Sequence, residues 1–326
     1  MKAVMCNSLG LPDTLSFEEV KDPVPGPGEV VIDMRSAGVN FPDVLMVQGL
    51  YQFKPELPFA PGGELAGVIS AVGDGVKRFK VGDRVIALVS TGAFAEKCIA
   101  EENRCVGLPD GVDFDAGAAF TLTYGTSWHA LKDRARLQAG ETVFVMGAAG
   151  GVGLSAIQIA KALGARVIAA ASSDEKLAVC KENGADEVIN YATEDMRARL
   201  KDLTGGKGPD VIYDPVGGDF AEAAFRSIAW RGRYLVIGFA NGEIPKIPLN
   251  LALLKGAELV GVFWGNYVAR EPANFAADLG DMFALIAAGK LRPHVSARFP
   301  LENGAEAISH LMNRKATGKV VVYNEG

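Results

Sequence analysis

The sequence predicts an α/β protein of two domains, in which a β-rich domain is followed by a parallel sheet covered by helices. The chain has 326 residues, which exceeds the roughly 250–300 residues at which a single hydrophobic core stops growing. Short strand-like runs separated by Gly, Pro and Asp fill the first ~120 residues. After Thr121, strand and helix patterns alternate, which is typical of a doubly wound parallel sheet.

The N-terminal part contains short runs with the composition of β-strands. They are Lys2–Cys6, Leu15–Val20, Glu29–Ala37, Gly67–Val72, Arg84–Leu88 and Glu96–Ala100. Turn-forming residues separate these runs, as at Pro23–Gly28 and Gly73–Gly75. Because a barrel closes many short strands without leaving open edges, we expect a compact barrel here.

The alternating region supplies strands and helices in turn. The expected strands are Thr142–Gly147, Arg166–Ala171, Glu187–Asn190, Val211–Asp214, Arg233–Ile237, Glu258–Trp264 and a closing strand Lys319–Tyr323. The expected helices are Leu154–Leu163, Asp174–Asn183, Glu194–Thr204, Phe220–Trp230 and Phe275–Ala288. Glycines stand where the C-caps of helices are expected, at Gly164, Gly184, Gly205 and Gly232.

The segment Gly147–Gly153 carries four glycines where a buried strand passes into a helix. This layout is typical of a turn that binds the pyrophosphate of a dinucleotide, because glycine lets the phosphate approach the backbone N–H groups at the helix start. The spacing is Ala148-x-Gly150-x-x-Gly153, which departs from the strict glycine motif. A membrane span over Thr142–Ala160 is the alternative, but so many glycines would make a poor spanning helix.

Composition excludes several classes of partner. The chain has 33 basic and 39 acidic residues and a net charge of −6, which argues against broad binding to nucleic acid or anionic membranes. No signal-peptide core follows Met1, so a cytoplasmic location is expected. The four cysteines form no C-x-x-C pair, so their spacing suits neither a disulfide framework nor a structural zinc site.

The end of the second strand of the alternating region favours NADPH. Ser172 and Ser173 stand where an enzyme that uses NAD usually has Asp or Glu. Serine hydroxyls with Lys176, and with Tyr191 after the third strand, suit a 2′-phosphate better than a ribose diol. The alternative is that Asp174 and Lys176 are the solvated start of a helix.

Several segments spread over essentially the whole chain occur together in one order. They are Gly38–Asp43, Gly49–Tyr51, Leu57–Gly62, Val81–Arg84, Gly147–Gly153, Val188–Tyr191 and Tyr213–Gly217. With these segments the sequence resembles the zinc-free quinone oxidoreductase (ζ-crystallin-like) family of the medium-chain dehydrogenase/reductase superfamily. The resemblance implies a GroES-like β-barrel domain at residues 1–123, completed by 265–326, and a Rossmann domain at 124–264 that binds NADPH.

The sequence departs from the zinc alcohol dehydrogenases of the same superfamily at their metal ligands. Those enzymes have a cysteine where this chain has Asn40 and a histidine where it has Gly63, and Thr91–Phe94 replaces their four-cysteine lobe. Without soft ligands no Lewis acid is expected to acidify an alcohol. The expected reaction is therefore metal-free hydride transfer from NADPH to a quinone or an α,β-unsaturated carbonyl.

The resemblance also implies the site. Asn40 and Tyr51 are the expected catalytic residues, each as a hydrogen-bond donor, with a purely packing role as the alternative for Tyr51. The expected cofactor-binding residues are Asn40, Phe41, Asp43, Val44, Thr126, Ala149, Gly150, Gly151, Val152, Ser172, Lys176, Tyr191, Gly238, Phe239, Ala240, Asn241, Val262, Phe263, Trp264 and Lys315. Lys315 is equally well interpreted as a surface charge, and no metal ligand is expected.

The resemblance further implies a homodimer that forms through the edge strand Glu258–Trp264, because an unpaired apolar edge invites strand pairing. Two other functions stay open. One is an enone or enoyl-thioester reductase, which shares the fold and lacks the metal. The other is a non-catalytic NADPH-binding or RNA-binding role, which the acidic charge disfavours.

Overall fold

The computed structural model describes residues 1–325, which form two compact units. Unit 1 contains residues 1–122 and the chain from residue 293 onward, and unit 2 contains residues 123–292. The chain therefore leaves unit 1, builds unit 2, and returns to finish unit 1. The sequence-based division ended the second domain at residue 264, whereas unit 2 also includes the next two helices, α9 (Trp264–Arg270) and α10 (Pro272–Ala287).

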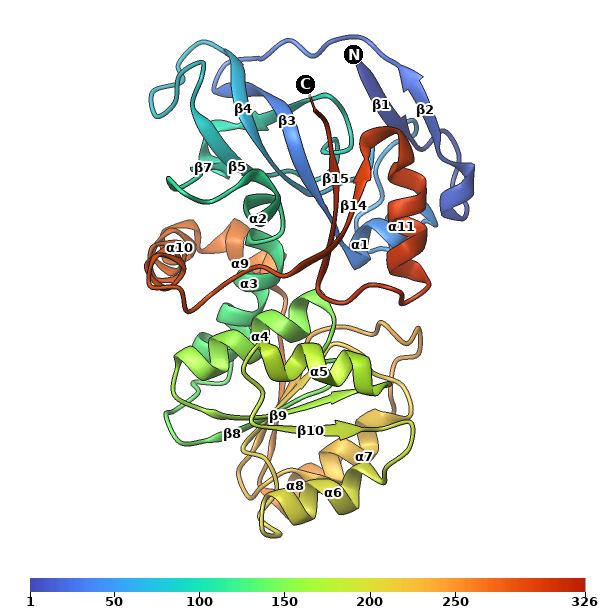
Figure 1. The fold of residues 1–326 in the computed structure, drawn as a ribbon, viewed down its shortest axis with the longest axis vertical. Helices are drawn as coiled ribbons and strands as arrows, with labels where there is room; N and C mark the ends of the chain where they lie inside the picture. The colour runs from blue at the N-terminus through green and yellow to red at the C-terminus, as the bar shows by residue number, and fades with distance from the viewer. Residues whose placement is uncertain (326) are drawn as a thin grey trace. The chain divides into compact units, whose positions relative to one another are not determined.

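Unit 1 is built on a curved antiparallel sheet with one parallel pair at its C-terminal side (Figure 1). The strand order is β14 (Val295–Pro300), β15 (Lys319–Tyr323), β3 (Glu29–Val39), β4 (Glu64–Val72), β5 (Arg84–Leu88) and β7 (Cys105–Gly107). β6 (Lys97–Glu101) pairs with the first half of β3, and β1 (Lys2–Met5) forms a hairpin with β2 (Ser16–Glu19). The long strand β3 thus joins the N-terminal strands to β15.

Short helices complete unit 1. They are α1 (Phe41–Val47), α2 (Phe114–Ala118), α11 (Gly304–Met312) and the single turns η1 (Pro12–Thr14), η2 (Glu102–Arg104) and η4 (Leu301–Asn303). α11 packs on α1 and on the C-terminal strands, so the returning chain helps to enclose the core. That core includes Ile32 and Met34 of β3, Leu65 of β4, and Ile308 of α11.

Unit 2 contains a six-stranded sheet in which every pair is parallel. The order is β10 (Glu187–Asn190), β9 (Arg166–Ala171), β8 (Thr142–Val145), β11 (Val211–Asp214), β12 (Arg233–Val236) and β13 (Glu258–Gly261). α4 (Gly151–Ala162) and α5 (Asp174–Glu182) cover one face, and α6 (Met196–Leu203), α7 (Phe220–Ser227) and α8 (Asn250–Lys255) lie on the other (Figure 1). α3 (Thr121–Trp128) continues into the π-helical turn η3 (His129–Arg134).

The structure confirms the predicted fold class and several strand limits, and it corrects others. The expected strand Glu258–Trp264 ends at Gly261, and Trp264 begins α9. Gly232 caps no helix, because α7 already ends at Ser227. Gly232 instead packs closely against Ile228, since a Cβ added to the glycine would lie 2.4 Å from Cγ1 of Ile228. The uncharged segment 142–160 forms β8, a turn and most of α4. Among the described residues, no helix has the length and apolar character that crossing a membrane requires.

Candidate functional site

A glycine turn joins β8 to α4 at the carboxyl edge of the sheet in unit 2. Gly147 has a φ of 55°, and a Cβ on it would lie 2.7 Å from Cγ2 of Val216. A Cβ on Gly153 would lie 2.5 Å from the carbonyl oxygen of Ala148. α4 begins at Gly151, and no side chain caps its N-terminus. The turn therefore presents backbone N–H groups at the positive end of a helix, an arrangement that suits a pyrophosphate.

Asp214 holds the neighbouring loop against this turn. The residue is 3% exposed, and its Oδ1 accepts hydrogen bonds from the backbone N–H groups of Val216 (2.8 Å) and Gly217 (2.9 Å). Its Oδ2 accepts a hydrogen bond from the Tyr234 hydroxyl. β8 and β11 are adjacent at the point where the strand order reverses, which is where open α/β sheets bind ligands.

A buried chain of hydroxyl groups ties α3 to the start of α4. Ser127 Oγ lies 2.8 Å from both Ser155 Oγ and the Tyr213 hydroxyl oxygen. The Ser127 hydroxyl also donates to the carbonyl oxygen of Val152 at 3.1 Å, and Val152 lies in the first turn of α4. Thr126, the half-buried residue before Ser127, is thereby held near the glycine turn.

Two of the residues predicted to bind the 2′-phosphate, Ser172 and Tyr191, follow the ends of β9 and β10. Ala171 pairs with Asn190, so Ser172 and Tyr191, which follow them, leave adjacent strand ends. Ser173 Oγ accepts a hydrogen bond from the backbone N–H of Lys176 at the start of α5. In the first turn of α5, the Oδ1 atom of Asp174 accepts a hydrogen bond from Asn190 Nδ2 at 2.8 Å. Ser172 and Tyr191 therefore follow neighbouring strand ends, and the carboxylate of Asp174 nearby already has a hydrogen-bond partner in Asn190.

The remaining predicted residues of unit 2 lie on two segments. The loop Gly238–Asn241 packs along the turn after β11, because the backbone N–H groups of Ala240 and Asn241 donate to the carbonyl oxygens of Pro215 (3.1 Å) and Val216 (2.9 Å). Trp264 covers the backbone beside Thr126, since a Cβ at Gly125 would lie 2.7 Å from the indole. Val262 is half-buried, and Phe263 is 57% exposed.

Unit 1 holds a buried polar cluster, here called the Asn40 cluster, formed by Asn40, Asp43, Glu64 and Lys319. Asn40 precedes α1, and its backbone N–H donates to Asp43 Oδ2 at 2.8 Å. Its Nδ2 donates to Glu64 Oε1 (2.9 Å) and to the carbonyl oxygen of Gly38 (3.3 Å). Lys319 Nζ donates to Asn40 Oδ1 (2.6 Å) and Glu64 Oε1 (2.7 Å). None of the four residues is more than 4% exposed.

These contacts change the roles expected for two residues. Both N–H groups of the Asn40 amide are engaged within unit 1, so Asn40 does not present the free donor that the sequence suggested. The Asp43 side chain faces the interior, where burial raises its pKa to about 7 against the opposing effects of the Asn40 N–H and the Lys319 ammonium. Burial and the Asp43 charge raise the pKa of the half-buried Tyr51, which keeps its phenol protonated.

Comparison with known proteins adds independent evidence. Residues 26–110 match the model of the alcohol dehydrogenase GroES-like domain, and residues 151–282 match that of the zinc-binding dehydrogenases. Quinone oxidoreductase-like protein 2 of Mus musculus is 41% identical over 322 residues, covering 98% of this chain and 91% of the relative. The quinone oxidoreductase of Pseudomonas aeruginosa is 38% identical over 323 residues, covering 98% and 99%. The chain belongs to the quinone oxidoreductase family of the medium-chain dehydrogenase/reductase superfamily.

A solved structure of this quinone oxidoreductase family supports the fold and the cofactor class. The Escherichia coli quinone oxidoreductase complexed with NADPH matches with a TM-score of 0.93 and 30% identity, covering 99% of this chain and 100% of that one. The chain is accordingly an oxidoreductase that binds NAD(P), with a GroES-like unit and a Rossmann-type unit.

The Asn40 cluster does not suit the zinc ion of related alcohol dehydrogenases. Gly63 and Asn40 stand at the two positions where those enzymes have a histidine and a cysteine. Gly63 has no side chain, and the Asn40 amide oxygen already accepts a hydrogen bond from the Lys319 ammonium group. A cation placed at this oxygen would meet that positive charge at close range. Within residues 1–325, moreover, no group of three or more His, Cys, Asp or Glu side chains is arranged to hold a metal ion.

Several residues that organise the polar contacts of each unit were not predicted from the sequence. Glu64 and Lys319 each open a buried strand, and a charge at the start of an apolar run was the available signal. Asp214 lies within the family segment Tyr213–Gly217, but its partner Tyr234 has no signal of its own. Lys315, by contrast, is exposed in unit 1 and makes no contact that assigns it to the site.

Proposed function

We propose that this enzyme reduces a quinone with NADPH and without a metal ion. The observation that carries the proposal is the Asn40 cluster, which puts an amide bound to an ammonium group where related alcohol dehydrogenases have a zinc ligand. NADPH supplies a hydride from its nicotinamide ring when it is bound. The quinone takes up that hydride and one proton, and the products are a hydroquinone and NADP⁺.

The chain's own residues have three tasks in this proposal. The glycine turn binds the pyrophosphate through its backbone N–H groups. Ser172, Lys176 and Tyr191 bind the 2′-phosphate. Tyr51 donates a hydrogen bond to the oxygen of the acceptor, because a phenol is protonated at neutral pH and burial raises the pKa of Tyr51 further.

The choice of acceptor is tested by anaerobic oxidation of NADPH with a panel of quinones, enals and enoyl-CoA thioesters. We expect the highest kcat/KM with a quinone, and no loss of rate after treatment with a chelator. Faster turnover of an enal or enoyl thioester would support the alternative reductase reaction. Inhibition by the chelator would contradict metal-free transfer.

The role of Tyr51 is tested by Tyr51→Phe, which removes the hydroxyl and keeps the ring. We expect kcat with a quinone to fall on the order of 10–100-fold, because a positioned donor is lost. Tyr191→Phe is the matched control, with an expected effect on the KM for NADPH instead of kcat. An unchanged kcat in Tyr51→Phe would mean that this ring only packs.

The preference for NADPH is tested by Lys176→Ala. We expect the KM for NADPH to rise on the order of 10–100-fold, the equivalent of about 1.5–3 kcal/mol for a hydrogen bond to a charged group. The KM for NADH should not change. The control is Lys181→Ala on the same helix, because Lys181 Nζ donates to the carbonyl oxygen of Asp186. Equal effects on both nucleotides, or a lower KM for NADH in the wild type, would contradict the preference.

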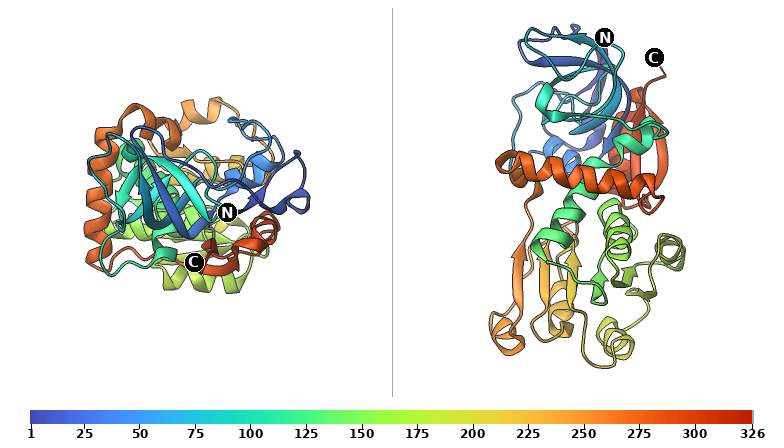
Figure 2. Two further views of the ribbon diagram at one scale, coloured as in Figure 1. Left: turned by 90° about the horizontal axis from the view of Figure 1, so that it is seen from above. Right: turned by 90° about the vertical axis from the view of Figure 1, so that its left-hand side faces the viewer.

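We further propose that two copies associate through the free edge of unit 2. β13 is the last strand of its sheet (Figure 2, right) and pairs with β12 alone. Large apolar side chains on and near it are exposed, namely Leu249 (74%), Leu253 (81%), Leu254 (67%), Leu259 (40%) and Phe263 (57%). Exposed apolar residues beside an unpaired strand favour pairing with an identical edge about a two-fold axis.

Sedimentation velocity at micromolar concentration tests this association. The wild type should sediment with twice the 34.3 kDa mass of one chain. A variant with both Leu253→Glu and Leu254→Glu should sediment as a monomer, whereas Val24→Glu, which changes an exposed residue of unit 1, should remain a dimer. A monomeric wild type would refute the dimer.

A cytoplasmic location also remains a proposal. It is supported by the cysteines, since Cys6, Cys98, Cys105 and Cys180 are all buried free thiols, as is usual in reducing compartments. Cell fractionation with an antibody to the native protein tests it.

A further inference from the structure

The register of three neighbouring strands creates the Asn40 cluster. β3 lies between β15 and β4 and is antiparallel to both. Val320 of β15 pairs with Val39, and Leu65 of β4 pairs with Ala37, so the first residues of β15 and β4 come to the end of β3. Lys319, Glu64 and Asn40 meet there although 255 residues separate Glu64 from Lys319.

Neighbouring backbone groups are shaped to accommodate these side chains. A Cβ at Gly38 would lie 2.5 Å from Glu64 Oε1, so glycine leaves room for the carboxylate. The second carboxylate oxygen, Oε2, accepts a hydrogen bond from the backbone N–H of Leu122 at 2.9 Å. Both oxygens of Glu64 and the amide of Asn40 are therefore fixed by specific partners.

Stability alone does not explain the cluster. Two carboxyl groups and one ammonium group are buried together, and taking charges out of water costs several kcal/mol per ion. Apolar side chains of similar volume are often at least as stabilising at such a site. The hydrogen bonds instead converge on one point, the residue that precedes α1.

We propose that Lys319 is a positioning residue, whose ammonium group fixes Asn40 and Glu64 and thereby the first turn of α1. This inference rests on the proposed function, because that turn carries Phe41 and Val44, which the family resemblance predicts to contact the cofactor of that reaction. Lys319 itself touches neither cofactor nor acceptor in this proposal. It acts through the Asn40 side chain, to which it donates at 2.6 Å.

The first experiment separates positioning from stability. Lys319→Met alone leaves Glu64 charged and unpaired, so it is combined with Glu64→Gln, which removes the second charge. We expect the double variant to have nearly the wild-type urea midpoint, but a kcat reduced on the order of 10-fold or more because α1 is no longer fixed. The Kd for NADPH should change less than about threefold, since the proposed phosphate contacts are in unit 2.

Lys97→Met serves as the matched control, since Lys97 is a partly exposed lysine of unit 1 that pairs with Asp22. It should retain the wild-type kcat. A double variant with both wild-type stability and wild-type kcat would overturn the proposal.

The second experiment needs no cofactor and applies even if the double variant is unstable. The groups that face Asp43 are Lys319, which lowers its pKa, Glu64, which raises it, and Tyr51, whose own pKa Asp43 raises. Infrared difference spectroscopy of the protonated carboxyl band should therefore show the Asp43 pKa falling in Glu64→Gln. With Asp43→Asn as the control that removes the band, an unchanged pKa would refute a connected cluster.

Together the experiments distinguish two kinds of failure. If the wild type reduces no quinone but the Asp43 pKa falls in Glu64→Gln, the proposed acceptor is wrong and the cluster stands. The kcat comparison is then repeated with an acceptor that the wild type does reduce. If the wild type reduces quinones and the double variant does so equally well, the acceptor stands and the positioning role is wrong.

Discussion

Asp43 is a buried carboxyl group that titrates near neutral pH. Burial disfavours its charged form and raises its pKa to about 7. A native pKa above the ordinary value means that the folded protein binds a proton that the unfolded chain has released. The proton bound to Asp43 therefore contributes fully to the free energy of unfolding at acidic pH. This contribution is lost as the pH rises from about 4 through about 7.

The raised pKa of Asp43 predicts the effect of Asp43→Asn. The variant keeps an oxygen that can accept from the Asn40 N–H but has no proton to lose. Between pH 5 and 7 the wild-type free energy of unfolding should fall, relative to the variant, by up to about 1.4 kcal/mol per pH unit. Urea titrations at several pH values measure this difference. Parallel pH profiles for the two proteins would show that Asp43 is ionised throughout.

The glycines of unit 2 differ in what surrounds them, which gives a prediction at the scale of single elements. Gly153 has no room for a side chain beside the Ala148 carbonyl, whereas a methyl group added at Gly280 in α10 would have no atom within 4 Å. Gly153→Ala should therefore distort the turn before α4 and weaken NADPH binding at least about tenfold. Gly280→Ala should leave binding unchanged and raise stability by about 0.5–1 kcal/mol.

Fluorescence titration with NADPH and thermal unfolding measure the two glycine variants. Normal binding by Gly153→Ala would mean that the turn relaxes without losing its function. Because Gly280 lies inside a helix, a loss of stability in Gly280→Ala would be inconsistent with the open space around it.

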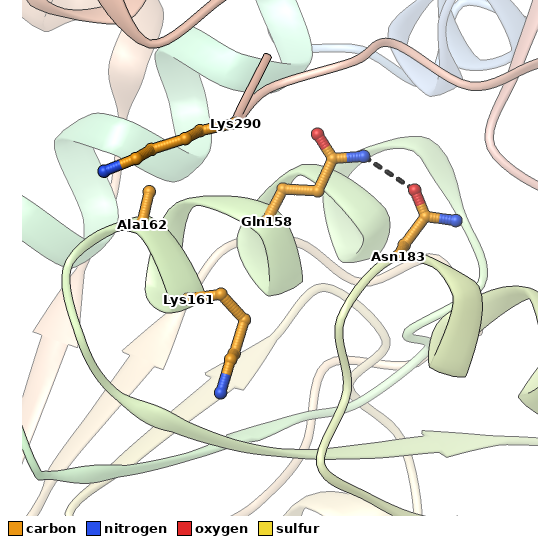
Figure 3. Close-up of a pocket in the computed structure, with 5 residues that line it drawn as sticks. All are labelled: Gln158, Lys161, Ala162, Asn183 and Lys290. Carbon is orange, nitrogen blue, oxygen red and sulfur yellow. Dashed lines mark hydrogen bonds between the residues drawn. The ribbon is translucent and has the colours of Figure 1, made fainter. Parts of the chain in front are cut away.

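Gln158 connects α4 to its neighbours through both ends of its amide, and Figure 3 shows the hydrogen bond from its nitrogen to Asn183. Its Nε2 donates to Asn183 Oδ1 (2.6 Å) and to the carbonyl oxygen of Arg292 (2.9 Å). Its Oε1 accepts from the Tyr124 hydroxyl (2.8 Å) and from the Arg292 N–H (2.8 Å). Gln158, Lys161 and Asn183 line a surface pocket of about 270 Å³, but Gln158 is 7% exposed and fully bonded within unit 2. The residue is therefore best explained as structural.

Gln158→Leu should accordingly destabilise the protein by about 2–4 kcal/mol, because the Tyr124 hydroxyl and the Asn183 amide lose partners at a buried site. Lys161→Met on the same helix breaks a partly exposed ion pair with Asp186 and should change stability by less than about 1 kcal/mol. Urea unfolding measures both variants. Equal losses of stability in Gln158→Leu and Lys161→Met would show that the Gln158 amide contributes no more to stability than the exposed ion pair of Lys161.

The elements that the sequence predicted well share one property. β9 and β11 are short, mainly apolar runs ended by polar residues, so composition alone marks their limits. α1 was not among the helices predicted from the sequence, although Pro42 stands in its first turn, where proline is favoured. Aromatic residues suit strands and helices alike, which is why the strand at Glu258 was extended to Trp264.

The candidate site was predictable in unit 2 and much less so in unit 1. In unit 2 the glycine turn between β8 and α4 consists of residues adjacent in sequence, so a local pattern predicts the turn. In unit 1 the decisive contact joins Lys319 to Asn40, and it depends on the pairing of β15 with β3. A single sequence contains no signal for such a distant pairing.

At the scale of the whole molecule, unit 1 is discontinuous and unit 2 is continuous. Every strand of the unit 2 sheet lies within residues 123–292, whereas the sheet of unit 1 needs β14 and β15 from the C-terminal segment. We therefore predict that residues 123–292 fold cooperatively when expressed alone, and that residues 1–122 do not. Circular dichroism during thermal unfolding tests both fragments. A cooperative transition for residues 1–122 would mean that β15 is dispensable.

The late position of Lys319 has a consequence for synthesis of the protein. At about 5–20 residues per second, the ribosome adds Lys319 roughly 10–50 s after Glu64, which lies 255 residues earlier. During this interval the nascent chain contains the acids of unit 1 without the base that later accompanies them. Those carboxyl groups must stay hydrated, so unit 1 remains open while unit 2 can already close. Lys319 is therefore added late in synthesis, and only then can the carboxyl groups of the part made first be buried beside their ammonium partner.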